Sequence, residues 1–132
     1  MQEFHWSEWY PLSLVLVARD EDVPDEPSVY EIKTDYEFGR LRGKSHVVYV
    51  GSTVKSLKGR LVHQRIKDPK ENLSRTEQLL REAGHALEFR FAIAPDGKIA
   101  KHMEAQRLMD YEKEHWELPP ANALLPRKTR KD

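Results

Sequence analysis

Three short segments with β-strand patterning most constrain what this 132-residue chain can fold into. Residues 87–94 alternate between two faces, with phenylalanines on one and charged side chains on the other, which predicts a half-buried strand. Residues 28–34 and 46–51 are rich in β-branched and aromatic side chains. They predict two antiparallel neighbours joined by a long basic hairpin loop over 37–45. The expected fold class is α+β, with a small central antiparallel three-stranded sheet flanked by helices.

Apolar residues at helical spacing predict three helices, over residues 54–67, 76–83 and 99–116. The last and longest is expected to bury one stripe of side chains, formed by Ala105, Leu108, Met109 and Trp116. With the three strands, these helices provide enough patterned apolar surface for one core. One main domain is therefore expected over residues 28–126, preceded by an N-terminal arm or extra strand over 1–27 and followed by a basic tail over 127–132.

Several classes of protein are excluded by composition. The chain has no cysteine, which removes disulfide frameworks, thiolate zinc sites and cysteine nucleophiles. The longest apolar run, Leu12–Ala18, is far shorter than the ~20 residues that a membrane-spanning helix needs. The first residues are acidic and do not form a signal peptide. A cytoplasmic protein without membrane partners is the expectation.

The formal net charge of zero hides an uneven distribution. Residues 1–37 contain ten acidic and two basic residues, whereas residues 38–75 contain ten basic and two acidic ones. Such a basic segment suits a polyanion such as nucleic acid, and the alternative is that the two segments neutralise each other or face solvent. The bases expected to follow a phosphate backbone are Arg40, Arg42, Lys44, Lys55, Lys58 and Arg65.

The residues that suggest a chemistry are spread over the strands and helices. They are SVY at 28–30, YVG at 49–51, Arg60, Glu104 and Asn122. Each element is common by itself, but their order and spacing across most of the chain resemble the GIY-YIG endonuclease family. That resemblance implies the fold of the family and the hydrolysis of one DNA strand per active site.

Phosphodiester hydrolysis places negative charge on the phosphoryl oxygens and on the leaving alkoxide, where a divalent cation and a guanidinium can stabilise it. Glu104 is the expected ligand of Mg²⁺ or Mn²⁺, because Mg²⁺ takes few protein carboxylates and keeps several waters. Arg60 offers forked donors to the scissile phosphate. The resemblance implies that Tyr30 is the general base, that Tyr49 helps to position the water or the phosphate, and that Asn122 belongs to the site.

The sequence departs from the family pattern at three points. Ser28 replaces the glycine of the first motif, and the interval from Tyr30 to Tyr49 is longer than in compact members. The family often has a histidine four residues after the arginine, a position that Gln64 occupies here. His63 comes one residue earlier and also lies beside Arg60 on a helix, so we expect His63 to serve as the helper.

Three functions remain open at the level of sequence. The first is a metal-dependent DNA endonuclease that recognises branched or otherwise structured DNA, alone, as a homodimer or with a partner protein. The runner-up is a catalytically weak nucleic-acid-binding module of the same fold. The third is a protein-interaction domain whose acidic first third mimics or masks a nucleic-acid surface.

Overall fold

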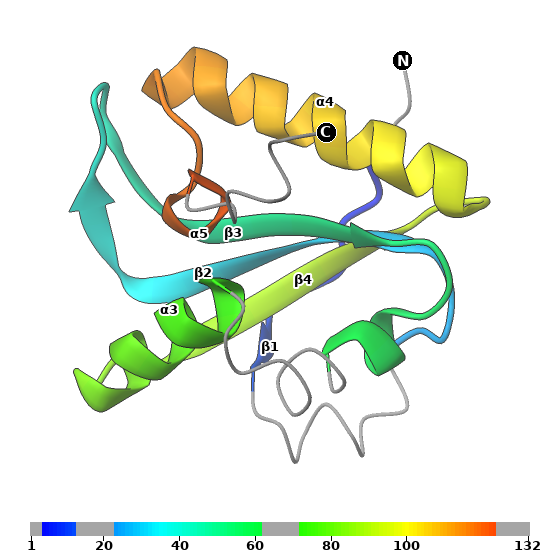
Figure 1. Cartoon of the computed structure of the whole chain (residues 1–132), viewed down its shortest axis with the longest axis horizontal. Coiled ribbons are helices and arrows are strands. Elements are labelled where there is room, and N and C mark those ends of the chain that lie inside the picture. Colours follow the sequence, from blue (N-terminus) through cyan, green and yellow to red (C-terminus); the bar gives the residue numbers. More distant parts are fainter. Residues whose placement is uncertain (1–3, 13–22, 62–71, 124–132) are drawn as a thin grey trace.

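The computed structural model describes residues 4–12, 23–61 and 72–123. Its strands are β1 (Tyr10–Pro11), β2 (Ser28–Gly39), β3 (Lys44–Thr53) and β4 (Leu87–Ile93). Its helices are α3 (Asn72–Glu82), α4 (Gly97–His115) and α5 (Pro120–Ala123), and residues 57–61 are also helical. The strands form one antiparallel sheet in the order β1-β4-β2-β3 (Figure 1). The α+β class is confirmed, but the sheet has four strands because residues 10–11 pair with β4.

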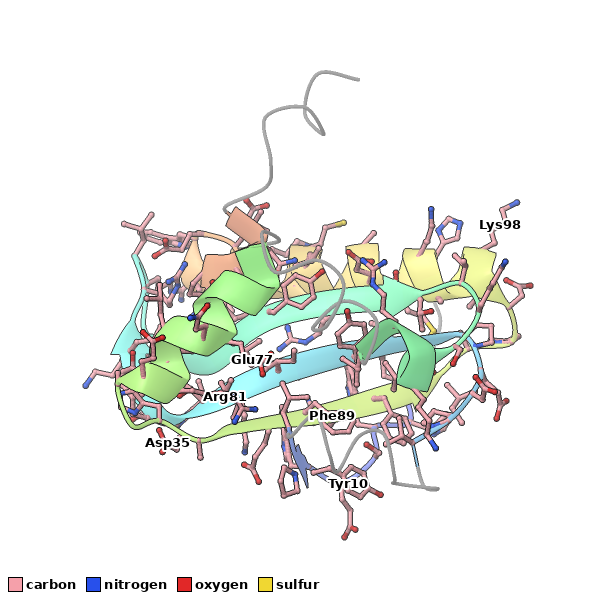
Figure 2. All side chains as sticks on the ribbon, turned by 60° about the horizontal axis from the view of Figure 1, so that its bottom comes forward. Tyr10, Asp35, Glu77, Arg81, Phe89 and Lys98 are labelled. Carbon is pink, nitrogen blue, oxygen red and sulfur yellow. The ribbon has the colours of Figure 1, made fainter. Side chains whose placement is uncertain are left out.

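One face of the sheet is covered by α3 and by the helical turn at residues 57–61. Tyr30 and Ile32 of β2 and Phe89 of β4 pack there against Leu57 and Leu61. Figure 2 shows α3 and this turn in front of the sheet and α4 behind it. The alternation of β2 and β4 therefore places their large aromatic residues in the front core.

The opposite face is covered by α4. Val29 and Val50 pack on this side against Met103 of α4. Helix α4 begins after the N-cap Asp96, whose side chain accepts a hydrogen bond from the Ile99 N–H at 2.8 Å. Residues 28–34 of β2 are therefore covered on both faces, as in a three-layer arrangement of helix, sheet and helix.

The stripe predicted for the long helix is wrong. The residues that α4 buries are Ala100, Met103, Tyr111 and His115. Of the predicted set, Leu108 is half-buried, whereas Ala105, Met109 and Trp116 are exposed. Trp116 already lies outside the helix, as a C-cap with a left-handed backbone (φ 63°). The prediction followed the largest apolar side chains, but the true stripe mixes small and polar-tipped residues.

The other two predicted helices differ in their bounds. Helix α3 starts at Asn72, earlier than the predicted residue 76. The predicted helix over 54–67 begins only at residue 57, and Val54 before it is exposed. The rest of this helix lies in residues 62–71, outside the described part of the chain.

The β2–β3 hairpin is longer and its loop tighter than predicted. Strand β2 continues to Gly39, and β3 starts at Lys44. The register places Ile32 opposite Tyr49 but Lys33 opposite Val47, so that Val48 is the extra residue of a β-bulge. Because of this bulge, Val48 and Tyr49 both contact the front core.

The tip of the hairpin is fastened to the end of α4. The Arg42 N–H donates to the His115 carbonyl at 3.1 Å, and His115 Nδ1 lies 3.0 Å from the Arg42 carbonyl oxygen. Glu117 accepts from the Leu41 N–H at 2.6 Å and pairs with the Arg40 guanidinium at 2.8 Å. These contacts fix the tip at the end of the sheet remote from the helical turn at residues 57–61 (Figure 1).

The N-terminal segment borders β4. Ser7 donates its N–H to the Phe91 carbonyl at 2.8 Å and accepts from the Phe91 N–H at 3.0 Å through its hydroxyl. Figure 2 shows Tyr10 next to Phe89 at this edge, and their ring centroids are 5.8 Å apart. The extra strand foreseen within residues 1–27 therefore exists, at residues 10–11. Residues 13–22 and the tail after residue 123 lie outside the described part.

A buried carboxylate connects the sheet to α4. Glu31 of β2 is fully buried and pairs with Arg90 of β4 at 2.9 Å and with Arg107 of α4. The Arg90 guanidinium also lies over Trp6 and Trp9, at 4.3 and 4.8 Å from the ring centroids.

Of the helices that the structure describes, none combines the length and apolar character needed to cross a membrane.

Candidate active site at the edge of the sheet

Two tyrosine rings meet over a glycine in the β2–β3 hairpin. Tyr30 and Tyr49 lie on the same face, with ring centroids 6.0 Å apart. Gly51 is the register partner of Tyr30. A Cβ atom on Gly51 would lie 2.6 Å from Cε2 of Tyr49 and 2.8 Å from the Tyr30 hydroxyl. The glycine of the YVG motif therefore leaves room for both rings, a steric role that the motif alone did not reveal.

The Tyr30 hydroxyl is the most deeply placed polar group of this cluster. The residue has no exposed surface, and its hydroxyl forms no well-aligned hydrogen bond with a described residue. Burial raises the pKa of Tyr30 well above its ordinary value, and the neighbouring Tyr49 raises it further. The Arg60 guanidinium acts in the opposite direction, while Glu104 adds to the increase. At neutral pH the hydroxyl of the free protein therefore keeps its proton.

Residues from separate elements thus converge on one hydroxyl. Tyr49, Arg60 and Glu104 are all close enough to influence the ionisation of Tyr30. They come from β3, from the turn at residues 57–61, and from α4 on the other face of the sheet. This meeting is possible because β3 is an edge strand, so that a side chain of α4 can reach around it. Tyr30 and Tyr49 are therefore in ring contact and Arg60 lies next to them, whereas Glu104 is held by Ser52 on the α4 side of β3 and has the weakest influence of the three on Tyr30.

Glu104 is oriented by a residue that the sequence analysis missed. It is half-buried on α4, and its Oε1 accepts a hydrogen bond from the Ser52 hydroxyl. Ser52 directly follows Gly51 on β3 and faces α4. A carboxylate has about four acceptor positions, so this contact leaves others available. Nothing in the sequence points to Ser52, because its partner lies 52 residues away.

Asn122 has a different role from the predicted one. Its amide oxygen accepts from the Val50 N–H at 2.9 Å, and its amide nitrogen donates to the Val50 carbonyl at 2.8 Å. The side chain is buried, and both of its polar groups are engaged by the backbone of the edge strand. Asn122 therefore holds β3 in place next to Gly51 as a positioning residue.

The basic residues predicted to bind DNA separate into two groups. Lys55 and Arg60 line an open groove directly after β3, which is formed by Thr53, Val54, Lys55, Ser56, Gly59 and Arg60. Lys58 belongs to the same turn and is partly exposed. This group lies beside the candidate site. His63 and Arg65 lie in residues 62–71, outside the described part.

The second group lies at the hairpin tip. Tyr30 lies in β2, and Arg40 directly follows the end of this strand, ten residues further along the chain, which corresponds to about 30 Å of extended chain. Arg40 is only 10% exposed, and its guanidinium pairs with Glu117 and donates to the Leu118 carbonyl at 2.5 Å. The charge of Arg40 is therefore used inside the fold, and a contact of this residue with DNA stays a prediction. Arg42 and Lys44 are exposed but remote from the site.

A divalent cation fits this site through one carboxylate. Within the described residues, no three or more His, Asp or Glu side chains are grouped to hold a metal ion. Mg²⁺ bound near a phosphate commonly uses one or two carboxylates and completes its shell with water and phosphate oxygens. Glu104, held by Ser52 and half-open to solvent, can supply such a carboxylate.

Comparisons with models of known protein families, with curated proteins and with solved structures gave no match for this chain. The function of this chain is therefore inferred from the residues of the site itself. Its components are two tyrosines, an arginine and a serine-oriented glutamate at the open edge of a sheet.

Proposed function

We propose that this protein is a metal-dependent endonuclease of the GIY-YIG type, which hydrolyses phosphodiester bonds of DNA. The observation that carries the proposal is the convergence of Tyr49, Arg60 and Glu104 on the Tyr30 hydroxyl. A structural cluster would need neither an exposed guanidinium nor a half-exposed carboxylate beside a buried phenol. Phosphoryl transfer needs both charges, next to a group that can orient water.

The charged side chains of the site have different roles in the proposed reaction. Arg60 is exposed at the mouth of the cluster and is suited to bind the scissile phosphate through its forked donors. Glu104 would hold Mg²⁺ or Mn²⁺, and Ser52 keeps its carboxylate oriented. When bound, the cation supplies positive charge at the phosphoryl group and the leaving oxygen. Asn122 and Gly51 maintain the edge strand and the space between the rings.

Tyr30 is the residue whose protonation state decides the rate. In the free protein burial raises its pKa and keeps the hydroxyl neutral, so substrate binding must first give water access to this hydroxyl before it can orient an attacking water. To accept a proton from this water, Tyr30 must first ionise, and positive charge close to it favours that step. Cleavage is therefore expected to accelerate as pH rises above neutrality, with Tyr49 helping to hold the water or the phosphate.

One observation favours a second candidate, a nucleic-acid-binding module without strong catalysis. The raised pKa of Tyr30 makes it a poor base at neutral pH unless substrate and cation change its surroundings. The same modes of DNA recognition apply to both candidate functions. The protein would recognise the shape or structure of DNA, alone, as a homodimer that cuts both strands, or with a partner protein.

The first test uses Glu104→Ala against supercoiled, linear, single-stranded and branched DNA, each with Mg²⁺ and with EDTA. We expect the wild type to cut only with the cation, and the variant to lose at least about a hundredfold in rate, as for an essential charge-stabilising group. DNA binding should persist in the variant. Glu112→Ala, an exposed glutamate on the same helix, is the matched control and should cut normally.

Three results would redirect the proposal. Wild-type cleavage by Glu104→Ala would remove Glu104 from the metal site. Salt-sensitive DNA binding without cleavage in Mg²⁺ or Mn²⁺ would establish the binding module. Failure of the wild type to bind any DNA or RNA at low salt would favour a protein-interaction domain.

A further inference from the structure

The first turns of α4 carry an exposed basic surface. We define the α4 basic surface as Lys98, Lys101 and His102, which line a shallow groove together with Ala105. All three are exposed, and Figure 2 shows Lys98 pointing away from the molecule at the start of the helix. Lys98 and Lys101 are three residues apart and therefore lie on the same side of α4.

Some basic side chains of the described residues form ion pairs within the fold, and others do not. Its buried or half-buried arginines serve the fold: Arg40 pairs with Glu117, and Arg90 and Arg107 pair with Glu31. By contrast, Lys98 and Lys101 have no ion pair with any described residue. Two like charges on one helix face repel each other weakly, so their placement does not stabilise the helix. A polyanion bound from outside would balance them.

The α4 basic surface continues into the candidate site. Gly97 packs directly on the segment after β3, since a Cβ atom at Gly97 would lie 2.6 Å from Cβ of Val54. Lys98 and Lys55 are the next residues on the two touching segments. In the other direction, Lys101 lies one helical turn before Glu104. Cations therefore extend on both sides of this contact up to the edge where Glu104 lies.

We propose that the backbone of duplex DNA crosses the α4 basic surface next to the scissile phosphate, and does not run over the hairpin tip. This inference depends on the proposed function for the identity of the scissile phosphate. Lys98 and Glu104 are six residues apart, about 9 Å along a helix axis. This length corresponds to about two to three nucleotides of one strand at ~3.4 Å each. The lysines would thus contact phosphates close to the cut.

The experiment measures binding of a fluorescently labelled DNA duplex in EDTA, so that cleavage does not contribute. The variant is Lys98→Gln/Lys101→Gln, and its matched control is Arg42→Gln/Lys44→Gln at the hairpin tip. We expect the first variant to lose two phosphate contacts, which lowers the steepness of log K against log salt by about two. The ratio of its affinity at 50 mM salt to its affinity at 200 mM salt should be about tenfold smaller than the same ratio for the wild type. The control should bind like the wild type.

Retention of the charge provides the second arm. Lys98→Arg/Lys101→Arg should restore binding, and a thermal melt of each variant checks that it is folded. Wild-type binding by Lys98→Gln/Lys101→Gln, or a larger loss in the hairpin control, would overturn the inference. If Lys98→Gln/Lys101→Gln weakened the binding of duplex RNA but not of duplex DNA, the assignment of DNA as the ligand of this surface would be overturned. Reduced DNA binding in a protein that never cleaves would uphold this surface and remove only the nuclease proposal.

Discussion

The hydroxyl of Tyr30 destabilises the free protein while it forms the centre of the candidate site. It is buried without a well-aligned partner among the described residues. Leaving such a group unsatisfied costs on the order of 1–3 kcal/mol, and nearby Arg60 offsets only part of this. Functional sites commonly keep groups that stability alone would remove.

Tyr30→Phe should therefore abolish cleavage without weakening the fold. At pH 7 we expect the free energy of unfolding to change by less than about 1 kcal/mol, because the buried oxygen and its interaction with Arg60 are removed together and the ring is kept. Urea denaturation measures this, with Tyr36→Phe on the exposed part of β2 as the control. A loss of more than about 2 kcal/mol would mean that the hydroxyl has a strong partner.

The same substitution should change the alkaline stability of the protein. The pKa of Tyr30 is higher in the folded than in the unfolded chain. Its contribution is therefore fully present below the unfolded pKa of about 10, and is lost as pH rises from there through the folded pKa. In this window the wild type should lose about 1.4 kcal/mol per pH unit more than Tyr30→Phe does. Parallel stability curves up to pH 11 would contradict the shift.

At the residue scale, the sequence indicates which side chains belong to the site better than it indicates which groups each side chain contacts. Tyr30, Tyr49, Arg60 and Glu104 are identified because their order and spacing resemble the GIY-YIG pattern, although each residue alone is common. The structure brings Tyr30, Tyr49 and Arg60 together, with Glu104 on the α4 side of β3, and their tasks stay predictions. The pairing of Arg40 with the Leu118 carbonyl, across 78 residues, was not predictable, because only the folded chain places these groups side by side.

The β2–β3 hairpin shows what an element gains from contacts outside itself. Residues 37–45 were predicted as a basic, glycine-containing loop, but residues 38–39 pair with residues 44–45 as strand. Contacts of the tip with the end of α4 supply the stabilisation that local propensity does not. Gly43 closes the tip with a φ of 74°, which glycine adopts without strain.

Removing the carboxylate of Glu117 should loosen this tip. Glu117→Gln leaves the nearly buried Arg40 without its counter-charge and weakens the bond to the Leu41 N–H. We expect a loss of about 2 kcal/mol in the free energy of unfolding, below the full effect of a buried pair because Glu117 is itself partly exposed. Amide hydrogen exchange should accelerate at residues 39–44 and stay unchanged at residues 28–30. Equal acceleration at both ends would contradict a local clamp.

Cleavage offers a second readout of the same variant. Because the tip lies about 30 Å along the strand from Tyr30, Glu117→Gln should cut DNA at the wild-type rate under conditions in which it is folded. Arg42→Gln, which removes an exposed charge on the same tip, is the control and should change stability by less than about 0.5 kcal/mol. A large loss of cleavage in either variant would place the tip in the DNA path.

Across the whole molecule, Glu31 and its two arginines join the sheet to α4 and to the N-terminal segment. The carboxylate lies between β4 and α4, and Arg90 extends the network to Trp6 and Trp9 of the N-terminal segment. The alternation of β2 suggested one buried and one polar face. Because α4 covers the second face as well, the acidic residue on it is buried and needs cations. Strand patterning alone does not distinguish a solvated face from a covered one.

Glu31→Gln should therefore destabilise the entire fold. It leaves two partly buried arginines without a counter-charge, for which we expect a loss of about 3 kcal/mol in the free energy of unfolding. Chemical denaturation followed by tryptophan fluorescence measures this directly, since Trp6 and Trp9 contact Arg90. The matched control is Glu88→Gln, whose partner Lys33 lies 3.7 Å away at the surface. Its cost should stay below about 1 kcal/mol, and an equal cost for both variants would contradict a buried network.

The two outer strands of the sheet are closed by unlike means. The N-terminal segment, which includes Ser7, bonds to the outer edge of β4. On β3, the side-chain amide of Asn122 bonds to both the N–H and the C=O of Val50. A strand of another molecule that approached β3 would find these groups already satisfied, so fusion of two sheets into one ribbon is disfavoured. A strand could pair with β3 at Val50 only after the Asn122 amide had been displaced.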